Sequence, residues 1–285
     1  MSTAKLISGK EVSAQVKERV RAEVSLLKEK NISVGLAVII VGENPASRVY
    51  VNGKKKDCEE VGIASYEFAL PESTTQAELM ELVEKLNNDE KVDGILCQLP
   101  LPKHLDEKAV LNAINPDKDV DAFHPINVGK IMIGDYRFLP CTPAGVMEMI
   151  KSTGVSISGK ECVVVGRSNI VGKPMSMLLL HESGTVTICH SKTKDLKETC
   201  KKADILVAAV GVAKLITADM VKEGAVVIDV GMNRLDDGKL CGDVDYDSVG
   251  EVAGYITPVP GGVGLMTRAM LLENTLTASK LKANK

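Results

Sequence analysis

The chain of 285 residues contains no tryptophan, and aromatic residues make up only 3% of it. Platforms for stacking nucleic-acid bases need aromatic side chains, and a formal net charge of -3 gives no attraction to a phosphate backbone. No segment reaches the roughly 18 apolar residues of a membrane span, and the N-terminus lacks the apolar core of a signal peptide. We therefore expect a soluble cytoplasmic protein with neither nucleic-acid nor membrane partners.

Clustered metal ligands are also missing. The seven cysteines form no Cys-x-x-Cys pair, and the four histidines do not cluster with them, so we expect no metal site. Several cysteines, such as Cys97 and Cys162, lie inside apolar runs, which is typical of buried free thiols in a reducing compartment. Hydrophobic residues make up 45% of the chain, and its length suits two α/β domains.

The first half of the chain alternates between strand and helix patterns. Strands are predicted at 34–42, 63–69 and 93–98, and helices at 8–30, 46–61 and 75–87. Thr74 is the expected cap of the last of these helices. This order predicts a parallel sheet with helices on both faces. A proline-rich stretch at 99–102 and an irregular segment at 115–121 follow it.

The alternation restarts after a connecting helix predicted at 143–153. Strands are predicted at 162–165, 185–189, 204–209 and 225–230. A long helix at about 264–280 follows a Gly-Gly turn and is expected to pack back on the first lobe. The predicted fold is therefore α/β with two lobes: an N-terminal lobe (1–140) and a Rossmann-like lobe of dinucleotide-binding type (141–285).

Residues 162–172 carry the clearest functional signal. An apolar run ends at Gly166, Arg167 and Ser168 follow, and Gly172 stands just before an amphipathic segment. Such a strand–turn–helix presents free N–H groups and the positive end of a helix dipole to an anion, as in dinucleotide folds. Because Gly166 is followed directly by Arg167, the turn departs from G-x-G-x-x-G, and an ordinary α/β turn would read the same way.

The next strand indicates which dinucleotide would bind. An NAD-preferring lobe places a carboxylate at the end of its second strand, to bind the ribose 2′-hydroxyl. Here strand 185–189 is followed by His190, Ser191 and Lys192, and Arg167 lies in the first turn. A 2′-phosphate would find donors and no repulsion there, which favours NADP, although loops often carry such cations for solubility alone.

Four polar residues in the first lobe are candidates for chemistry. Tyr50 and Lys54 are four residues apart on one predicted helix and share a face, although such a pair is more often a solvated edge. Gln98 ends a buried strand, at the carboxyl edge where α/β sheets bind ligands, and Asp121 lies in a loop. The rigid, glycine-rich turn at 257–264 could admit a flat ligand or simply enter the last helix.

Seven short motifs occur in order along almost the whole chain. They are Tyr50-Val-Asn-Gly-Lys54, Gln98-Leu-Pro-Leu-Pro102, Asp117-Lys-Asp-Val-Asp121, Pro140-Cys-Thr-Pro143, Val165-Gly-Arg-Ser168 with Val171-Gly172, Cys189-His-Ser-Lys-Thr193 and Pro258-Val-Pro-Gly-Gly-Val-Gly264. In this order the chain closely resembles the FolD family of bifunctional methylenetetrahydrofolate dehydrogenase/cyclohydrolases. Each motif alone is modest, but the set at these separations is specific.

The resemblance implies a one-carbon enzyme that feeds purine biosynthesis. Members oxidise 5,10-methylenetetrahydrofolate with NADP and then hydrolyse the methenyl product to 10-formyltetrahydrofolate, in one cleft between two lobes. It also implies a homodimer formed through the second lobe, where strand 185–189 could be a sheet edge. The alternatives are a dehydrogenase without the hydrolytic step, another two-lobe NADP enzyme of the shikimate-dehydrogenase type, or an NADP-binding protein without catalysis.

The resemblance also implies roles for individual residues. Lys54 matches the catalytic lysine, Tyr50 the ring that stacks near the pterin, Gln98 the partner of the lysine and Asp121 the acid that anchors the pterin. Positions that match cofactor contacts are Gly166, Arg167, Ser168, Gly172, Ser191 and Met232. Positions that match the folate-lining segments are Leu99, Pro260, Gly261 and Gly262.

Three positions depart from the family pattern. Ala122 stands where glycine is usual, Leu265 where proline is usual and Arg268 where an apolar residue is usual. Ala122 would affect the Asp121 loop if that position needs a positive φ, and Leu265 would loosen the entry to the last helix. These departures bear on substrate affinity rather than on the reaction class. The Leu99–Pro100 and Val259–Pro260 bonds are candidates for cis peptides.

Overall fold

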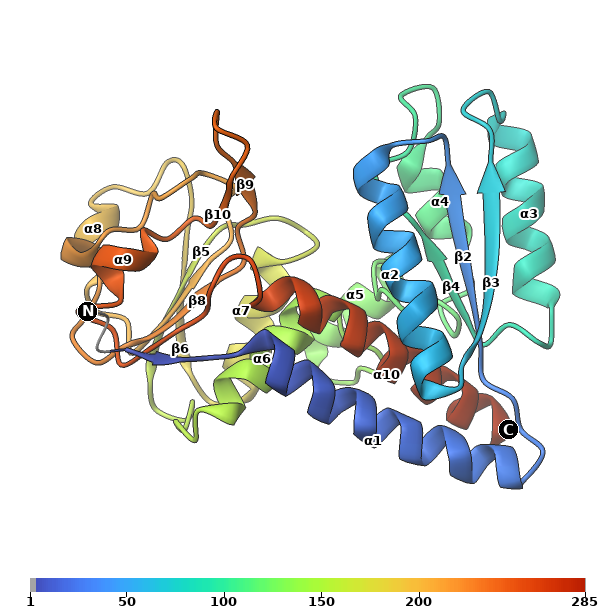
Figure 1. Ribbon diagram of the computed structural model, residues 1–285, viewed down its shortest axis with the longest axis horizontal. Coiled ribbons are helices and arrows are strands. Elements are labelled where there is room, and N and C mark those ends of the chain that lie inside the picture. Colours follow the sequence, from blue (N-terminus) through green and yellow to red (C-terminus); the bar gives the residue numbers. More distant parts are fainter. Residues whose placement is uncertain (1–3, 285) are drawn as a thin grey trace. The chain divides into compact units, whose positions relative to one another are not determined.

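The computed structural model describes residues 4–284, which fall into two compact units (Figure 1). The N-terminal unit comprises Gln15–Cys141 and the chain from Arg268 onward, and the C-terminal unit comprises the chain up to Ala14 and Thr142–Thr267. The unit boundary falls within α1 (Gly9–Glu29) and within α10 (Val263–Ala283). The last helix from Arg268 onward therefore belongs to the N-terminal unit, as predicted.

The N-terminal unit contains a three-stranded parallel sheet. Its strands are β2 (Gly35–Val41), β3 (Ala64–Leu70) and β4 (Gly94–Cys97), in the order β3-β2-β4. Every residue of β2 is buried, because the apolar run packs on both of its faces. Helices α2 (Pro45–Val61) and α3 (Gln76–Asn88) flank the strands in Figure 1. The three strands confirm the prediction, with boundaries one residue or so different.

The cap of α3 is one residue later than predicted. The N-cap is Thr75, whose side chain accepts a hydrogen bond from the Glu78 N–H, while the Glu78 carboxylate accepts from the Thr75 N–H. This reciprocal pair is a capping box, and it decides between two adjacent threonines because only Thr75 has a glutamate three residues on. The Thr74 hydroxyl instead donates to the Pro71 carbonyl at 2.7 Å.

The C-terminal unit contains a six-stranded parallel sheet in the order β1-β11-β8-β7-β5-β6. Its strands are β5 (Glu161–Val165), β6 (Thr185–Cys189), β7 (Ile205–Ala208), β8 (Val226–Asp229), β11 (Tyr255–Ile256) and β1 (Lys5–Leu6). The four strands β5 to β8 confirm the prediction. The two-residue strands β1 and β11 were not predicted. Strand β1 belongs to this sheet, although the next strand in the sequence, β2, belongs to the sheet of the N-terminal unit.

Shorter elements complete both units. In the N-terminal unit they are α4 (Glu107–Ala113) and α5 (Pro125–Ile133). In the C-terminal unit they are α6 (Cys141–Ser152), whose first residue belongs to the other unit, α7 (Gly172–His181), α8 (Leu196–Cys200), α9 (Tyr246–Val249), the hairpin β9 (Asn233–Arg234) with β10 (Leu240–Cys241), and a 3₁₀ turn at Ala218–Met220. None of the helices within residues 4–284 has the length and apolar character needed to cross a membrane.

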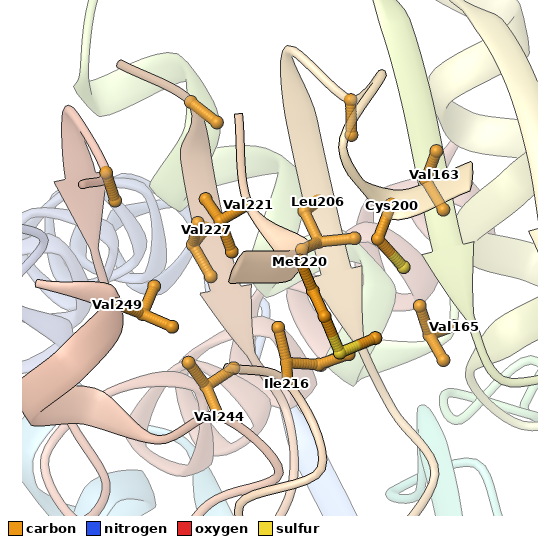
Figure 2. Packing of buried hydrophobic residues seen from close by; sticks show 14 of the residues in the cluster. Val163, Val165, Cys200, Leu206, Ile216, Met220, Val221, Val227, Val244 and Val249 are labelled. Atoms are coloured by element: carbon orange, nitrogen blue, oxygen red, sulfur yellow. The ribbon is translucent and has the colours of Figure 1, made fainter. Parts of the chain in front are cut away.

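One face of the six-stranded sheet is closed by an apolar cluster (Figure 2). Val163, Leu206 and Val227 project from three adjacent strands, and Ile216 and Met220 from the segment before β8 cover them. The three strand residues and Ile216 are at most 2% exposed. Burial of such side chains contributes on the order of 1.5–3 kcal/mol each, so this cluster stabilises the sheet of the C-terminal unit.

Each sheet has a point where successive connections leave in opposite directions. In the N-terminal unit the chain passes from β2 to β3 on one side and then to β4 on the other, and in the C-terminal unit it passes from β5 to β6 and then to β7. Ligands of open α/β sheets bind at the carboxyl ends of the strands at such switch points. Gln98 follows β4 and Gly166 follows β5, so the two predicted sites stand at the two switch points.

Candidate active site

A buried lysine, Lys54, is paired with the partly exposed Gln98 in the N-terminal unit. Lys54 lies on α2 and is only 8% exposed, and its Nζ donates to Gln98 Oε1 at 2.9 Å. The amide of Gln98 is held in turn, because its Nε2 donates to the Leu99 carbonyl at 2.8 Å and its N–H donates to the Ile39 carbonyl of β2. The Leu99–Pro100 bond is cis, as the sequence suggested it could be. Strand, turn and side chain together fix the acceptor that faces the lysine.

Asp121 lies in the loop that follows a bridge between Ile95 and Asp119. The buried Asp119 carboxylate organises this loop by accepting hydrogen bonds from the N–H groups of Phe123 and His124 and from Asn127 Nδ2. Ala122 has a φ of 57°, in the left-handed region that favours glycine, which costs an L-residue about 1–2 kcal/mol. Ala122 therefore adopts, at an energetic cost, a backbone conformation that glycine would adopt without strain.

The amine of Lys54 is surrounded by groups that set its charge. Burial lowers the pKa of Lys54 below its usual range, while the nearby Asp121 carboxylate opposes the shift and Arg268 adds to it. Burial raises the pKa of Asp121, and Lys54 opposes that shift. Both directions have the same physical cause, since a poorly hydrated site favours the uncharged forms. The surroundings of Lys54 therefore favour the neutral form of its amine over the charged form.

Arg268, the departure on α10, lies against the helix that carries the lysine. Its Nε is 3.0 Å from Asp57 Oδ2, an ion pair whose angle does not suit a hydrogen bond. A Cβ added to Gly53 would stand 2.0 Å from Arg268 Nη1, so the guanidinium packs directly against the α2 backbone. Asp57 also pairs with Lys17 at 2.7 Å. A permanent positive charge therefore adjoins the turn of α2 that contains Lys54.

Tyr50 precedes Lys54 by one turn of α2 and is partly exposed. Residues four apart in a helix share a face, so the ring and the amine project from the same side of α2. Tyr50, Lys54, Gln98 and Asp121 thus all belong to the N-terminal unit, on α2 and on the two loops that follow β4 and Asp119. Leu99 adjoins them in sequence and is partly exposed.

In the C-terminal unit the turn after β5 has no room for side chains at its two glycines. Gly166 has a φ of 138°, and an added Cβ would be 2.2 Å from the Ala209 carbonyl oxygen. At Gly172, the first residue of α7, an added Cβ would be 2.2 Å from the Gly166 carbonyl oxygen. The backbone at the start of α7 therefore packs directly against the backbone of the turn, as in phosphate-binding turns.

The residues around this turn fit NADP. Ser168 Oγ accepts from the N–H groups of Val171 and Gly172 at 3.1 and 3.2 Å, which closes the turn and leaves the hydroxyl hydrogen for a ligand. Arg167 and Ser191 are exposed. Lys192 follows β6 in place of a carboxylate, and its N–H donates to His190 Nδ1. This donor set suits a 2′-phosphate and contains nothing that repels one.

Two buried acids were missed by the sequence analysis. Asp243 is fully buried, and its carboxylate accepts from the N–H groups of residues 210–212 and from Asn233 Nδ2, at 2.7–3.0 Å. Asp229, with a pKa raised to about 6 mainly by burial, accepts from the N–H groups of Gly231, Asp243 and Val244. These two carboxylates hold the loops that follow β7 and β8 through backbone hydrogen bonds. Met232 lies in the loop after β8 and is 49% exposed. The sequence feature that could have pointed to Asp243 is its position directly after Gly242.

The turn at 257–264 also belongs to the C-terminal unit. Its Val259–Pro260 bond is cis, and Gly261 has a φ of 100°. At Gly262 an added Cβ would be 2.4 Å from the Pro258 carbonyl oxygen. Pro260 and Gly261 are exposed while Gly262 is buried. The glycines here are required by backbone conformation and by space.

Among residues 4–284 no group of three or more His, Cys, Asp or Glu side chains is arranged to hold a metal ion.

Comparison with known protein families gives a match for each half of the chain. Residues 7–121 match the catalytic domain of tetrahydrofolate dehydrogenase/cyclohydrolase, and residues 140–283 match the NAD(P)-binding domain of the same enzyme. The chain belongs to the tetrahydrofolate dehydrogenase/cyclohydrolase family. It is 65% identical over 280 residues to the bifunctional protein FolD of Acetivibrio thermocellus, covering 98% of each chain. Its identity to a Bacillus cereus FolD is 59% over 277 residues, with 97% of each chain covered.

Solved structures of the family share this fold. The bifunctional FolD enzyme of Campylobacter jejuni matches with a TM-score of 0.96 at 50% identity, covering 98% of this chain and all of that one. The Trypanosoma brucei FolD, solved with NADP and an inhibitor, matches with a TM-score of 0.95 at 40% identity over the full length of both chains. Membership of the family and the two-domain α/β fold are therefore confirmed.

Proposed function

We propose that this chain is a bifunctional enzyme that oxidises 5,10-methylenetetrahydrofolate with NADP and hydrolyses the methenyl product to 10-formyltetrahydrofolate. The observation that carries the proposal is the hydrogen bond of the buried Lys54 amine to Gln98, with Asp121 close enough to influence the lysine's charge. It stands in a chain that matches the catalytic and the NAD(P)-binding domains of one family. The same bound folate serves both reactions.

In the oxidation a hydride leaves a methylene carbon that is flanked by two nitrogens. NADP, when bound, accepts this hydride, and the folate becomes a delocalised cation. A protonated lysine beside that cation would repel it, so a neutral Lys54 stabilises the product. Asp121 offers two acceptor oxygens to the amino-pyrimidine edge of the pterin and fixes its register, while the Tyr50 ring stacks beside it.

In the hydrolysis water attacks the methenyl carbon. The neutral Lys54 amine takes one proton from that water as the C–O bond forms, and Gln98 holds the amine in place without adding a charge. Cleavage of the carbon bond to N5 then leaves the formyl group on N10: the proton held by Lys54 passes to N5, and the remaining hydroxyl proton is released to solvent as the C=O bond forms. The release of this one proton balances the positive charge of the methenyl substrate, and Lys54 returns to its neutral form.

One incubation with methylenetetrahydrofolate and NADP tests both activities. We expect NADPH to form together with 10-formyltetrahydrofolate when the folates are separated without acid. Accumulation of the methenyl compound would indicate a dehydrogenase alone. Turnover with NAD in place of NADP would contradict the role given to Arg167, Ser168 and Ser191, and no turnover with either nucleotide would leave a binding protein without catalysis.

The hydrolysis should depend on pH through Lys54. The groups that face its amine are Asp121 from the loop, Cys141 from α6, Cys58 from α2 and Arg268 from α10. Because the neutral amine is the active form and burial lowers its pKa, hydrolysis should rise with pH as the amine loses its proton. Replacing Arg268 with leucine removes a positive charge, which raises the pKa of Lys54 and should move this rise to higher pH.

A charge-preserving variant is the control for this prediction. Arg268→Lys keeps a cation near Asp57 and should retain a profile close to that of the parent enzyme, whereas Arg268→Leu also leaves Asp57 with Lys17 as its counter-ion. The measurement is the rate of loss of methenyltetrahydrofolate at a series of pH values, corrected for hydrolysis without enzyme. Identical profiles for the leucine and lysine variants would contradict an electrostatic role for Arg268.

We also propose that the protein is a cytoplasmic homodimer that supplies formyl groups for purine biosynthesis. The outer strand β6 supports the dimer, since its free edge has Ile188 38% exposed and could pair with a second copy. The seven cysteines, all within the described part of the chain, are free thiols, and six of them are buried, which suits a reducing compartment. The oligomeric state in solution would test the role of β6.

A further inference from the structure

A buried thiol adjoins the acid that is proposed to hold the pterin. Cys141 is the first residue of α6 and is 2% exposed. Its Sγ lies 3.3 Å from Asp121 Oδ1 and 3.6 Å from the Val120 carbonyl oxygen. The catalytic scheme above makes no use of this thiol. A group this close to a substrate-binding carboxylate affects where that carboxylate points.

The side chain of Asn274 on α10 decides which acceptor the thiol serves. Asn274 Nδ2 carries two hydrogens and lies 2.8 Å from the Val120 carbonyl and 2.8 Å from the Leu139 carbonyl, but 3.7 Å from Cys141 Sγ. Its two hydrogens therefore go to the two carbonyls. The Val120 carbonyl thus already accepts one hydrogen bond, and the single thiol hydrogen is directed to Asp121 Oδ1, which is the closer of its two acceptors.

Asn274 also fixes the distance between the two partners. Val120 directly precedes Asp121, and Leu139 lies two residues before Cys141, so one amide group ties together the segments that carry the acid and the thiol. Asn274 is itself only 6% exposed. The loop of Asp121 is irregular and includes the strained Ala122, so secondary structure alone does not hold the carboxylate.

We propose that Cys141, held by Asn274, is a positioning residue that orients the Asp121 carboxylate and thereby sets the affinity for the folate substrate. The thiol takes one lone pair of Oδ1 and leaves the others for the N–H groups of a pterin. Burial and the adjacent Asp121 keep the pKa of Cys141 well above its usual range, so the thiol retains the hydrogen that it donates. A carboxylate already oriented loses less freedom when the ligand binds.

This inference rests on the proposed function, in which Asp121 binds the pterin. Cys141→Ala should raise KM for methylenetetrahydrofolate roughly 3- to 10-fold, the effect of one hydrogen bond, with little change in kcat or in KM for NADP. Cys141→Ser keeps a donor and should fall between the parent and the alanine variant. Cys200→Ala removes another fully buried thiol from the C-terminal unit and should leave KM for the folate unchanged.

A double-mutant cycle separates positioning from simple packing. Binding of tetrahydrofolate should be measured calorimetrically for the parent, Cys141→Ala, Asp121→Ala and the double variant. If the thiol acts through the carboxylate, Cys141→Ala should weaken binding less than twofold once Asp121 is absent. Equal losses in both backgrounds would mean that Cys141 only fills space, and would overturn the inference.

The thiol itself provides a readout that needs no folate. The S–H stretching band of Cys141, isolated as the infrared difference between the parent and Cys141→Ala, should move to higher frequency in Asp121→Ala because its hydrogen bond is lost. An unchanged band would overturn the inference. Failure of the proposed function is distinguishable: the parent would then bind no tetrahydrofolate at all, whereas failure of this inference leaves parent binding intact and the losses additive.

Discussion

Replacing Lys54 with methionine is expected to slow hydrolysis of methenyltetrahydrofolate by about 10²–10⁴-fold, the usual contribution of a positioned general base. Methionine has a similar length and suits a site that is 8% exposed, but it cannot take a proton from water. Hydride transfer requires no proton acceptor and should fall much less. The measurement pairs the decay of added methenyltetrahydrofolate with the formation of NADPH from the methylene compound.

Lys56→Met is the matched control for this variant. Lys56 lies on the same helix but is exposed, so the same change of side chain there should leave both rates close to those of the parent. Full hydrolysis by Lys54→Met would show that Lys54 is not the base. A parallel loss of both activities would instead indicate that the lysine mainly holds the folate, since an effect on binding acts on both reactions.

The fold was predictable where strands are continuous apolar runs. Residues 34–42 predict a strand, and β2 occupies Gly35–Val41 with every residue buried, because helices cover both faces and leave no polar positions. The two-residue strands β1 and β11 have no such pattern. Lys5 and Leu6 join the sheet only because they pair with Tyr255 and Ile256, which are some 250 residues away along the chain.

The candidate site was predictable only where a residue type has a local reason. Gly166 and Gly172 stand out because a tight turn before a helix needs them, and the structure confirms that neither has space for a side chain. Contacts between distant segments were not predictable in this way. Asn274 and Cys141 are 133 residues apart, and neither shows a pattern that indicates the other.

Gly172→Ala should impair NADP binding while sparing hydrolysis of the folate. The added Cβ would lie 2.2 Å from the Gly166 carbonyl oxygen and 2.8 Å from the Arg167 nitrogen, both of which are backbone atoms that no rotamer change can move. The start of α7 must therefore shift away from the turn. Such overpacking costs about 1–3 kcal/mol, so KM for NADP should rise roughly 5- to 150-fold.

Hydrolysis of methenyltetrahydrofolate makes the result specific, because that reaction uses no nucleotide and its proposed base, Lys54, lies in the other unit. We expect its rate in Gly172→Ala to match the parent, which would show that the N-terminal unit remains folded. Gly129→Ala is the control, since an added Cβ there meets nothing within 4 Å and its φ is not positive. Parent-like affinity for NADP in Gly172→Ala would mean that the turn after β5 does not hold the pyrophosphate, and the anion site would then have to lie elsewhere on the C-terminal unit.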